Sequence, residues 1–376
     1  MTNDADRRPT LDLNSGKLDA IQLLRAIAAL AVVVHHVGLT LTSYYPTPLS
    51  SPLMMLSGLG AAGVDLFFVI SGYIIFRSTS KLESGPASAK SFLQKRALRI
   101  YPTYWIWTSV LLLMWLGGIA LKSHQFSPSV IAGSYFLVPV ARGDGSLHPI
   151  LDQGWTLTFE MYFYLVFSLI ILLGLRKKNL AWIASPFLLF AIAGLLPTIP
   201  ENLRGVVSSP LIGEFLLGVC LGWAFSKCPP PVRSIPSIRW GLTAIAIALL
   251  VFAALRGEVK GTGIERLLVY GTPSAVLVAL ALLTPSTQLV RRLTWLGDAS
   301  YSIYLTHGFF TLALGTVLKR GFTVSETPPA GVVLAIASLA ILLISSTAYW
   351  LVEKPVTRAI TAATRPGSST VAPQST

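Results

Sequence analysis

The residues most able to carry chemistry in this 376-residue chain are ionisable side chains inside long apolar segments. A charged side chain at membrane depth costs roughly 2.5–3.5 kcal/mol on insertion scales, so each one indicates a function or a buried partner. The candidates are Arg25, His35, His36, Asp65, Glu160, Glu214 and His307.

Arg25 and His36 lie in one apolar segment with ten residues between them. In a helix, eleven steps return to within about 20° of the starting direction and rise about 16 Å, so both side chains share one face. His35 lies about 80° from that face. A sugar hydroxyl is a poor nucleophile at neutral pH and needs a base. We therefore expect His36 to be the base, or a transient acyl carrier, with Glu160 orienting it.

A basic cluster at Lys95, Arg96 and Arg99 precedes another apolar segment. Guanidinium groups bind phosphates through paired, charge-assisted hydrogen bonds. Arg25, Arg96 and Arg99 are therefore expected to bind the phosphates of a nucleotide-carrying acyl donor made in the cytoplasm, or to line its path.

The apolar segment 154–175 carries three further candidates. Thr156, Glu160 and Tyr164 are spaced by four residues and share a helix face. Trp155 stands at the entry, where interfacial tryptophan is common. We expect Trp155, Tyr164 and Asp65 to bind the acceptor substrate.

Each candidate also has a structural alternative. His36 could pack at the interface, and Arg96 and Arg99 could serve topology alone. Glu160 could form an ion pair or a hydrogen bond between helices, and Asp65 could simply hydrogen-bond a neighbouring helix.

The elements that position these residues follow from composition. Hydrophobic residues make up 53% of the chain and charged residues 12%, against about 25% charged in soluble proteins. Runs of about 20 apolar residues cross a hydrocarbon core of roughly 30 Å, and inside lipid they must be helical. Segment 129–140 is shorter and is expected to be interfacial or re-entrant. The sequence thus predicts an all-α, polytopic membrane protein with about ten transmembrane helices, at 19–40, 56–76, 101–121, 154–175, 179–198, 208–226, 238–255, 264–283, 299–318 and 330–352.

The net charge of +13 is mainly a topology signal, because most Lys and Arg residues fall in alternate connecting segments, on the side of the N-terminus. Both termini are therefore expected in the cytoplasm, and no nucleic acid is expected as a partner. The polar ends, 1–16 and 359–376, are expected to be disordered and to flank one transmembrane domain at 17–358.

Several segments resemble the membrane-bound acyltransferase-3 family that modifies bacterial polysaccharides. The segments are LDAIQLLRAIAALAVVVHHV, with Arg25 and His36, GVDLFFVISGYII at 63–75, FLQKRALRIYPTYW at 92–105, with Arg96 and Arg99, GWTLTFEMYFYLVF at 154–167, GEFLLG at 213–218, LGDASYSIYLTHG at 296–308, and YWLVEKP at 349–355.

The resemblance implies ten helices and an acyl-coenzyme A donor, commonly acetyl. It places the family's functional Arg and His on Arg25 and His36, its donor-linked arginine pair on Arg96 and Arg99, and its acidic position on Glu160. Thr156 stands where the family often has serine, which keeps the hydroxyl. The stretch 152–167 is most similar to members that decorate exopolysaccharides or lipochitooligosaccharides.

These observations predict an O-acyltransferase of the bacterial inner membrane. It would move an acetyl group from cytoplasmic acetyl-coenzyme A, without a metal, to a hydroxyl of an extracytoplasmic or lipid-linked glycan such as exopolysaccharide. Membrane lipid and the polysaccharide synthesis machinery are the expected partners. The alternatives are a secondary transporter or flippase for a glycan precursor, with the acids as a proton relay, and a non-catalytic subunit of a polysaccharide synthase.

Overall fold

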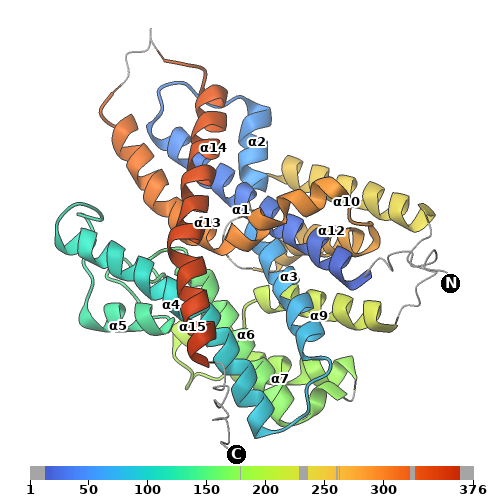
Figure 1. Cartoon of the computed structure of the whole chain (residues 1–376). Helices are drawn as coiled ribbons and strands as arrows, with labels where there is room; N and C mark the ends of the chain where they lie inside the picture. The colour runs from blue at the N-terminus through green and yellow to red at the C-terminus, as the bar shows by residue number, and fades with distance from the viewer. Residues whose placement is uncertain are drawn as a thin grey trace, which may run out of the picture.

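The computed structural model describes residues 13–177, 179–227, 236–259, 261, 263–321 and 327–364. Within these ranges the regular elements are helices and no strand occurs (Figure 1). The predicted all-α class is therefore confirmed.

Four helices pack backbone to backbone at the centre of the molecule: α1 (Leu13–Tyr44), α3 (Ala62–Thr79), α9 (Leu211–Lys227) and α13 (Gln288–Leu318). α1 packs against α13 and α3, and α3 packs against α9. Glycine permits these approaches, because a Cβ at Gly72 or Gly218 would overlap backbone atoms across the α3–α9 contact. A Cβ at Gly297 would likewise overlap the backbone of Gln22 on α1. Small residues serve the same purpose in membrane helix packing generally.

The remaining helices surround this centre (Figure 1). They are α2 (Ser51–Leu59), α4 (Pro86–Leu116), α5 (Pro128–Phe136), α6 (Gly154–Leu172), α7 (Leu180–Ala193), α8 (Glu201–Val207), α10 (Pro236–Arg256), α11 (Ile264–Arg266), α12 (Thr272–Leu283), α14 (Ala330–Ala348) and α15 (Lys354–Thr364). Short helical turns are η1 (Leu175–Lys177), η3 (Leu267–Gly271) and η5 (Tyr349–Glu353).

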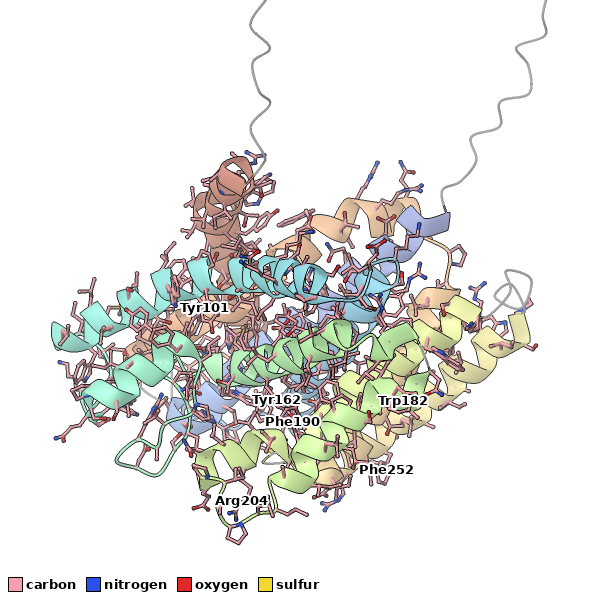
Figure 2. All side chains as sticks on the ribbon, turned by 90° about the horizontal axis from the view of Figure 1, so that it is seen from below. Tyr101, Tyr162, Trp182, Phe190, Arg204 and Phe252 are labelled. Carbon is pink, nitrogen blue, oxygen red and sulfur yellow. The ribbon has the colours of Figure 1, made fainter. Side chains whose placement is uncertain are left out.

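Eight helical segments in the described part of the chain are long and apolar enough to cross a membrane. The other two predicted spans, 101–121 and 179–198, overlap α4 and α7. The first half of α4 is strongly polar, and α7 has only 14 residues. Figure 2 labels Trp182, Phe190 and Phe252, which lie on the outside of α7 and α10 with exposed fractions of 45%, 40% and 56%. Such an apolar exterior is suited to lipid.

Three boundaries refine the predictions. The segment at 129–140 forms the nine-residue helix α5, which is too short to cross a bilayer. Helix α1 begins at Leu13 and α15 runs to Thr364, so helix extends into both ends that were expected to be disordered. At the C-terminal end the reason is packing, because α15 contacts α4. The outermost parts of both ends, 1–12 and 365–376, lie outside the described residues.

Candidate active site

A cavity of about 330 Å³, here named the arginine cavity, opens between α1, α3, α4, α6 and α13. Five of the predicted site residues line it: Arg25, Arg96, Arg99, Glu160 and Tyr164. Arg25 comes from α1, the arginine pair from α4 and the other two from α6. The structure thus collects guanidinium groups that are about 70 residues apart in the sequence.

The three arginines keep most of their hydrogen-bonding capacity. Arg25 Nη1 donates to Gln22 Oε1 at 2.8 Å, and Arg96 Nη2 donates to Ser78 Oγ at 2.8 Å. Arg99 is exposed and has no hydrogen bond within the described ranges. In those same ranges none of the three forms an ion pair. The cavity therefore presents positive charge that an anion could neutralise.

Two aromatic rings also hold the guanidinium group of Arg96. Its guanidinium lies over the rings of Phe92 and Tyr164, at 5.6 and 5.7 Å from their centroids. Such cation–π contacts fix the plane of a guanidinium without using its N–H groups.

Glu160 does not contact His36, contrary to the role expected from the sequence. Its carboxylate accepts a hydrogen bond from Tyr164 and another from Ser71 Oγ at 3.3 Å. The reason is the position of Glu160 along α6. Glu160 lies five residues beyond Trp155, about 7.5 Å further along α6, and faces the arginine cavity.

A second cavity of about 240 Å³, the histidine cavity, holds the other candidates. His35, His36 and Trp155 line it together with the carboxylates Asp152 and Glu258 and with Arg266. The cavity joins α1 to the segments that precede α6 and follow α10.

His36 is oriented by its own helix. Its Nδ1 lies 2.9 Å from the Val32 carbonyl oxygen, and because a carbonyl only accepts, Nδ1 carries the hydrogen and donates. In the neutral ring Nε2 then has a free lone pair. A general base requires this tautomer, and here a backbone carbonyl, instead of a carboxylate, fixes it.

Two further imidazoles adjoin His36. The ring of His307 lies 4.8 Å from that of His36, and the ring of His35 lies 5.1 Å away. Both rings also donate Nδ1 to backbone carbonyls, at Ile303 and Ser57. Among the residues that the structure describes, His307 Nε2 is buried without a hydrogen-bond partner, so a second acceptor nitrogen belongs to the ring next to the candidate base.

Asp65 lines neither cavity. It is fully buried and accepts two hydrogen bonds from Arg266, from Nε at 2.8 Å and from Nη2 at 2.7 Å. Its position differs from the expected contact with substrate, because the carboxylate is used to hold a guanidinium at the wall of the histidine cavity. Arg266 was not predicted from the sequence. The available signal was Asp65 itself, since a carboxylate at membrane depth requires a cationic partner.

Trp155 and Tyr164, both expected to bind the acceptor, face different cavities. Trp155 lines the histidine cavity and stacks on His148, with centroids 5.9 Å apart and planes 14° apart. Tyr164 lines the arginine cavity. Nine helical residues separate the two, a rise of about 13 Å.

Asp152 lies two residues before the start of α6. His148 Nδ1 is 2.9 Å from its Oδ1, and Arg142 Nη2 is 3.9 Å away. Burial acts to raise the pKa of Asp152, but the hydrogen bond from His148 and the charges of His148 and Arg142 outweigh it and lower that pKa below its ordinary value. A carboxylate is therefore available at neutral pH to accept hydrogen bonds in the histidine cavity.

Glu214, the remaining acidic candidate, is also fully buried. It lines neither cavity, and neither carboxyl oxygen has a hydrogen-bond partner in the described part of the chain.

Two residues, Val64 and Tyr304, line both cavities. The Tyr304 hydroxyl accepts a hydrogen bond from Thr156 Oγ1 at 2.9 Å and donates to the Gln153 carbonyl oxygen at 3.3 Å. Its ring centroid lies 5.8 Å from that of His307. The two cavities therefore adjoin each other at this tyrosine and at Val64.

Comparison with known proteins assigns the family. The family model described as an acyltransferase domain matches residues 18–348, most of the chain. The chain belongs to the acyltransferase-3 family. The family membership therefore supports an acyl-transferring enzyme over the transporter, the flippase and the non-catalytic subunit.

The relatives of this acyltransferase-3 protein include proteins named for carbohydrate polymers. It is 33% identical to the exopolysaccharide production protein ExoZ of Rhizobium meliloti, over 80% of this chain and 90% of ExoZ. It is 24% identical to the peptidoglycan O-acetyltransferase OatA of Listeria monocytogenes, over 77% of this chain but only 48% of OatA. It is 26% identical to the putative membrane-bound transacylase BcsY of Komagataeibacter xylinus, over 76% of this chain and 70% of BcsY. No solved structure matches the chain.

Proposed function

We propose that this acyltransferase-3 protein is a glycan O-acetyltransferase of the bacterial inner membrane. It takes the acetyl group from acetyl-coenzyme A on the cytoplasmic side and transfers it to a sugar hydroxyl on the opposite side. The observation that carries the proposal is the pair of adjoining cavities, one with three arginines and one with two histidines, which share the lining residues Tyr304 and Val64.

The donor binds in the arginine cavity. Arg25, Arg96 and Arg99 hold its phosphates, because they line the cavity without a carboxylate partner. Glu160 is fixed by Tyr164 and Ser71 and accepts hydrogen bonds from amide N–H groups of the donor arm. The thioester end then reaches Tyr304, the wall of the histidine cavity.

The acceptor binds in the histidine cavity. Trp155 offers an aromatic face to a sugar ring, and Asp152 and Glu258 accept hydrogen bonds from its hydroxyls. The names of ExoZ and OatA, which refer to exopolysaccharide and peptidoglycan, support a glycan acceptor.

The reaction is a direct acyl transfer. His36 Nε2 takes the proton of the acceptor hydroxyl while the oxygen of that hydroxyl attacks the thioester carbonyl carbon. The new C–O bond forms, the C–S bond breaks, and the proton passes from His36 to the thiolate of coenzyme A. This proton transfer returns His36 to its neutral form and leaves coenzyme A as a neutral thiol, and no further reactant is needed.

The test uses purified protein in nanodiscs with radiolabelled acetyl-coenzyme A and an oligosaccharide acceptor. General-base catalysis contributes about 10²–10⁴-fold, so His36→Gln should lose that much transfer while still binding coenzyme A. The matched control is His124→Gln, because His124 lies on a loop and lines neither cavity. Undiminished transfer by His36→Gln would remove the base from the mechanism.

A further inference from the structure

A third hollow of about 480 Å³, here named the apolar groove, runs between α1, α2 and the end of α10. It is larger than either cavity of the candidate site. Its walls are mostly aliphatic and sulfur-containing side chains: Leu39, Leu49, Met54, Met55, Leu59 and Leu255.

The apolar groove adjoins the histidine cavity. His35 and Glu258 line both, with His35 Nε2 and Glu258 Oε1 3.9 Å apart. No residue lining the groove also lines the arginine cavity. A ligand in the groove therefore has access to the acceptor side of the site and no direct access to the donor side.

The groove also opens toward lipid. Met54 on α2 is 50% exposed, and Leu255 on α10 is 71% exposed. Helix α10 packs little of its surface inside the protein. In the predicted orientation α1 and α10 both end at the extracytoplasmic side, so the groove lies in the outer half of the bilayer. Methionine is unbranched and polarizable, and it adapts to flexible apolar ligands.

We propose that the apolar groove holds the hydrocarbon chain of a membrane-anchored acceptor, whose sugar reaches the histidine cavity past His35 and Glu258. The acceptor is then a glycolipid or a lipid-linked glycan, acetylated while still attached to its lipid. This inference rests on the proposed function, and it specifies the acceptor class of that same site.

The rival occupant is the acyl chain of the donor. An acyl group enters from the arginine cavity, which shares no lining residue with the groove, and an acetyl group is too short to extend past His36 and His35. A chain attached to the acceptor requires no such detour.

Gly58 on α2 provides the test. Gly58 lines the groove, and a Cβ built there meets no atom closer than 3.9 Å, so the substitution Gly58→Trp starts from an open position in the groove wall. The matched control is Gly241→Trp on α10, where a Cβ also meets open space and which lies outside the groove.

Acetyl transfer is measured in nanodiscs with two probe acceptors, hexadecyl β-glucoside and methyl β-glucoside. Gly58→Trp should lower transfer to the hexadecyl glycoside by roughly tenfold, because its chain loses buried apolar contact, and leave transfer to the methyl glycoside unchanged. Gly241→Trp should leave both rates unchanged, which separates groove binding from the general enrichment of the lipid probe in the membrane.

Three results would overturn the inference. They are an unchanged hexadecyl rate in Gly58→Trp, an equal loss with both glycosides, and a selective loss with hexanoyl-coenzyme A as the donor. A hexadecyl glucoside with a diazirine in its chain gives an activity-independent readout, since it should label Met54 and Met55 in the wild type and not in Gly58→Trp. If the wild type is labelled but acetylates neither glycoside, the proposed acetyl transfer to glucosides fails while the groove assignment stands.

Discussion

At the residue scale, Tyr304 is the side chain that we expect to separate donor from acceptor in the proposed function. It lines both cavities and is held at its hydroxyl by Thr156 and Gln153. Tyr304→Ala should join the cavities and admit water to the thioester, raising acetyl-coenzyme A hydrolysis by about tenfold relative to transfer. The ratio of free acetate to acetylated acceptor measures this effect.

Tyr304→Phe is the control for that prediction. It keeps the ring and loses only two neutral hydrogen bonds, so the hydrolysis-to-transfer ratio should stay within about threefold of wild type. A ratio in Tyr304→Ala equal to that of Tyr304→Phe would mean that the ring does not divide the cavities.

The Asp65–Arg266 pair makes a second prediction at this scale. Asp65→Leu leaves a buried guanidinium without its partner, which typically costs about 3–5 kcal/mol in buried pairs. The double variant Asp65→Leu with Arg266→Met removes both charges and should recover most of the thermal stability lost by the single variant. The unfolding temperature in detergent measures both. A double variant as unstable as the single one would show that the pair does not act as a unit.

At the scale of elements, the α3–α9 contact depends on glycine. A Cβ at Gly218 would overlap the backbone of Val69 and Tyr73, and backbone cannot move aside as a flexible side chain can. Gly218→Leu should therefore abolish the folded protein, seen as loss of the monodisperse peak in size-exclusion chromatography. Gly241→Leu, at an open position, should elute as the wild type does.

The helices were the part of the structure most open to prediction from sequence. Apolar runs of membrane length locate the spans, because lipid leaves a backbone few other ways to satisfy its hydrogen bonds. What the runs could not give was the contribution of α4, whose polar first half carries Arg96 and Arg99 and still packs into the bundle. Hydropathy depends on composition alone, whereas the position of α4 depends on its contact with α6.

The candidate site was predictable in its residue types and less so in its pairings. Helical geometry placed Arg25 and His36 on one face, but the structure puts them in different cavities, because the two residues lie about 16 Å apart along α1. The partners of Asp65 and Glu160 depend on which helices adjoin α3 and α6, and spacing within one helix contains no such information.

At the scale of the whole molecule, three arginines that lack a carboxylate partner in the described residues gather at the arginine cavity, where an anionic ligand would bind. Coenzyme A at a hundred times its dissociation constant should stabilise the folded protein by about 2.7 kcal/mol, seen as a raised unfolding temperature. Arg96→Gln with Arg99→Gln should abolish this shift. Raising ionic strength should weaken it in the wild type, since exposed charges are screened.

Lys90→Gln is the matched control, because Lys90 is exposed on the same helix and does not line the arginine cavity. A stabilisation by coenzyme A that survives loss of both arginines would place the donor phosphates elsewhere.

The glycine contacts that clamp α1, α3, α9 and α13 together have a consequence for transport. Helices held at backbone distance cannot separate without losing these contacts, so we expect the passage required by the proposed function to open through rotation of side chains. In the proposed function the bulky nucleotide then stays on the donor side, and only the two-carbon acetyl group crosses the membrane.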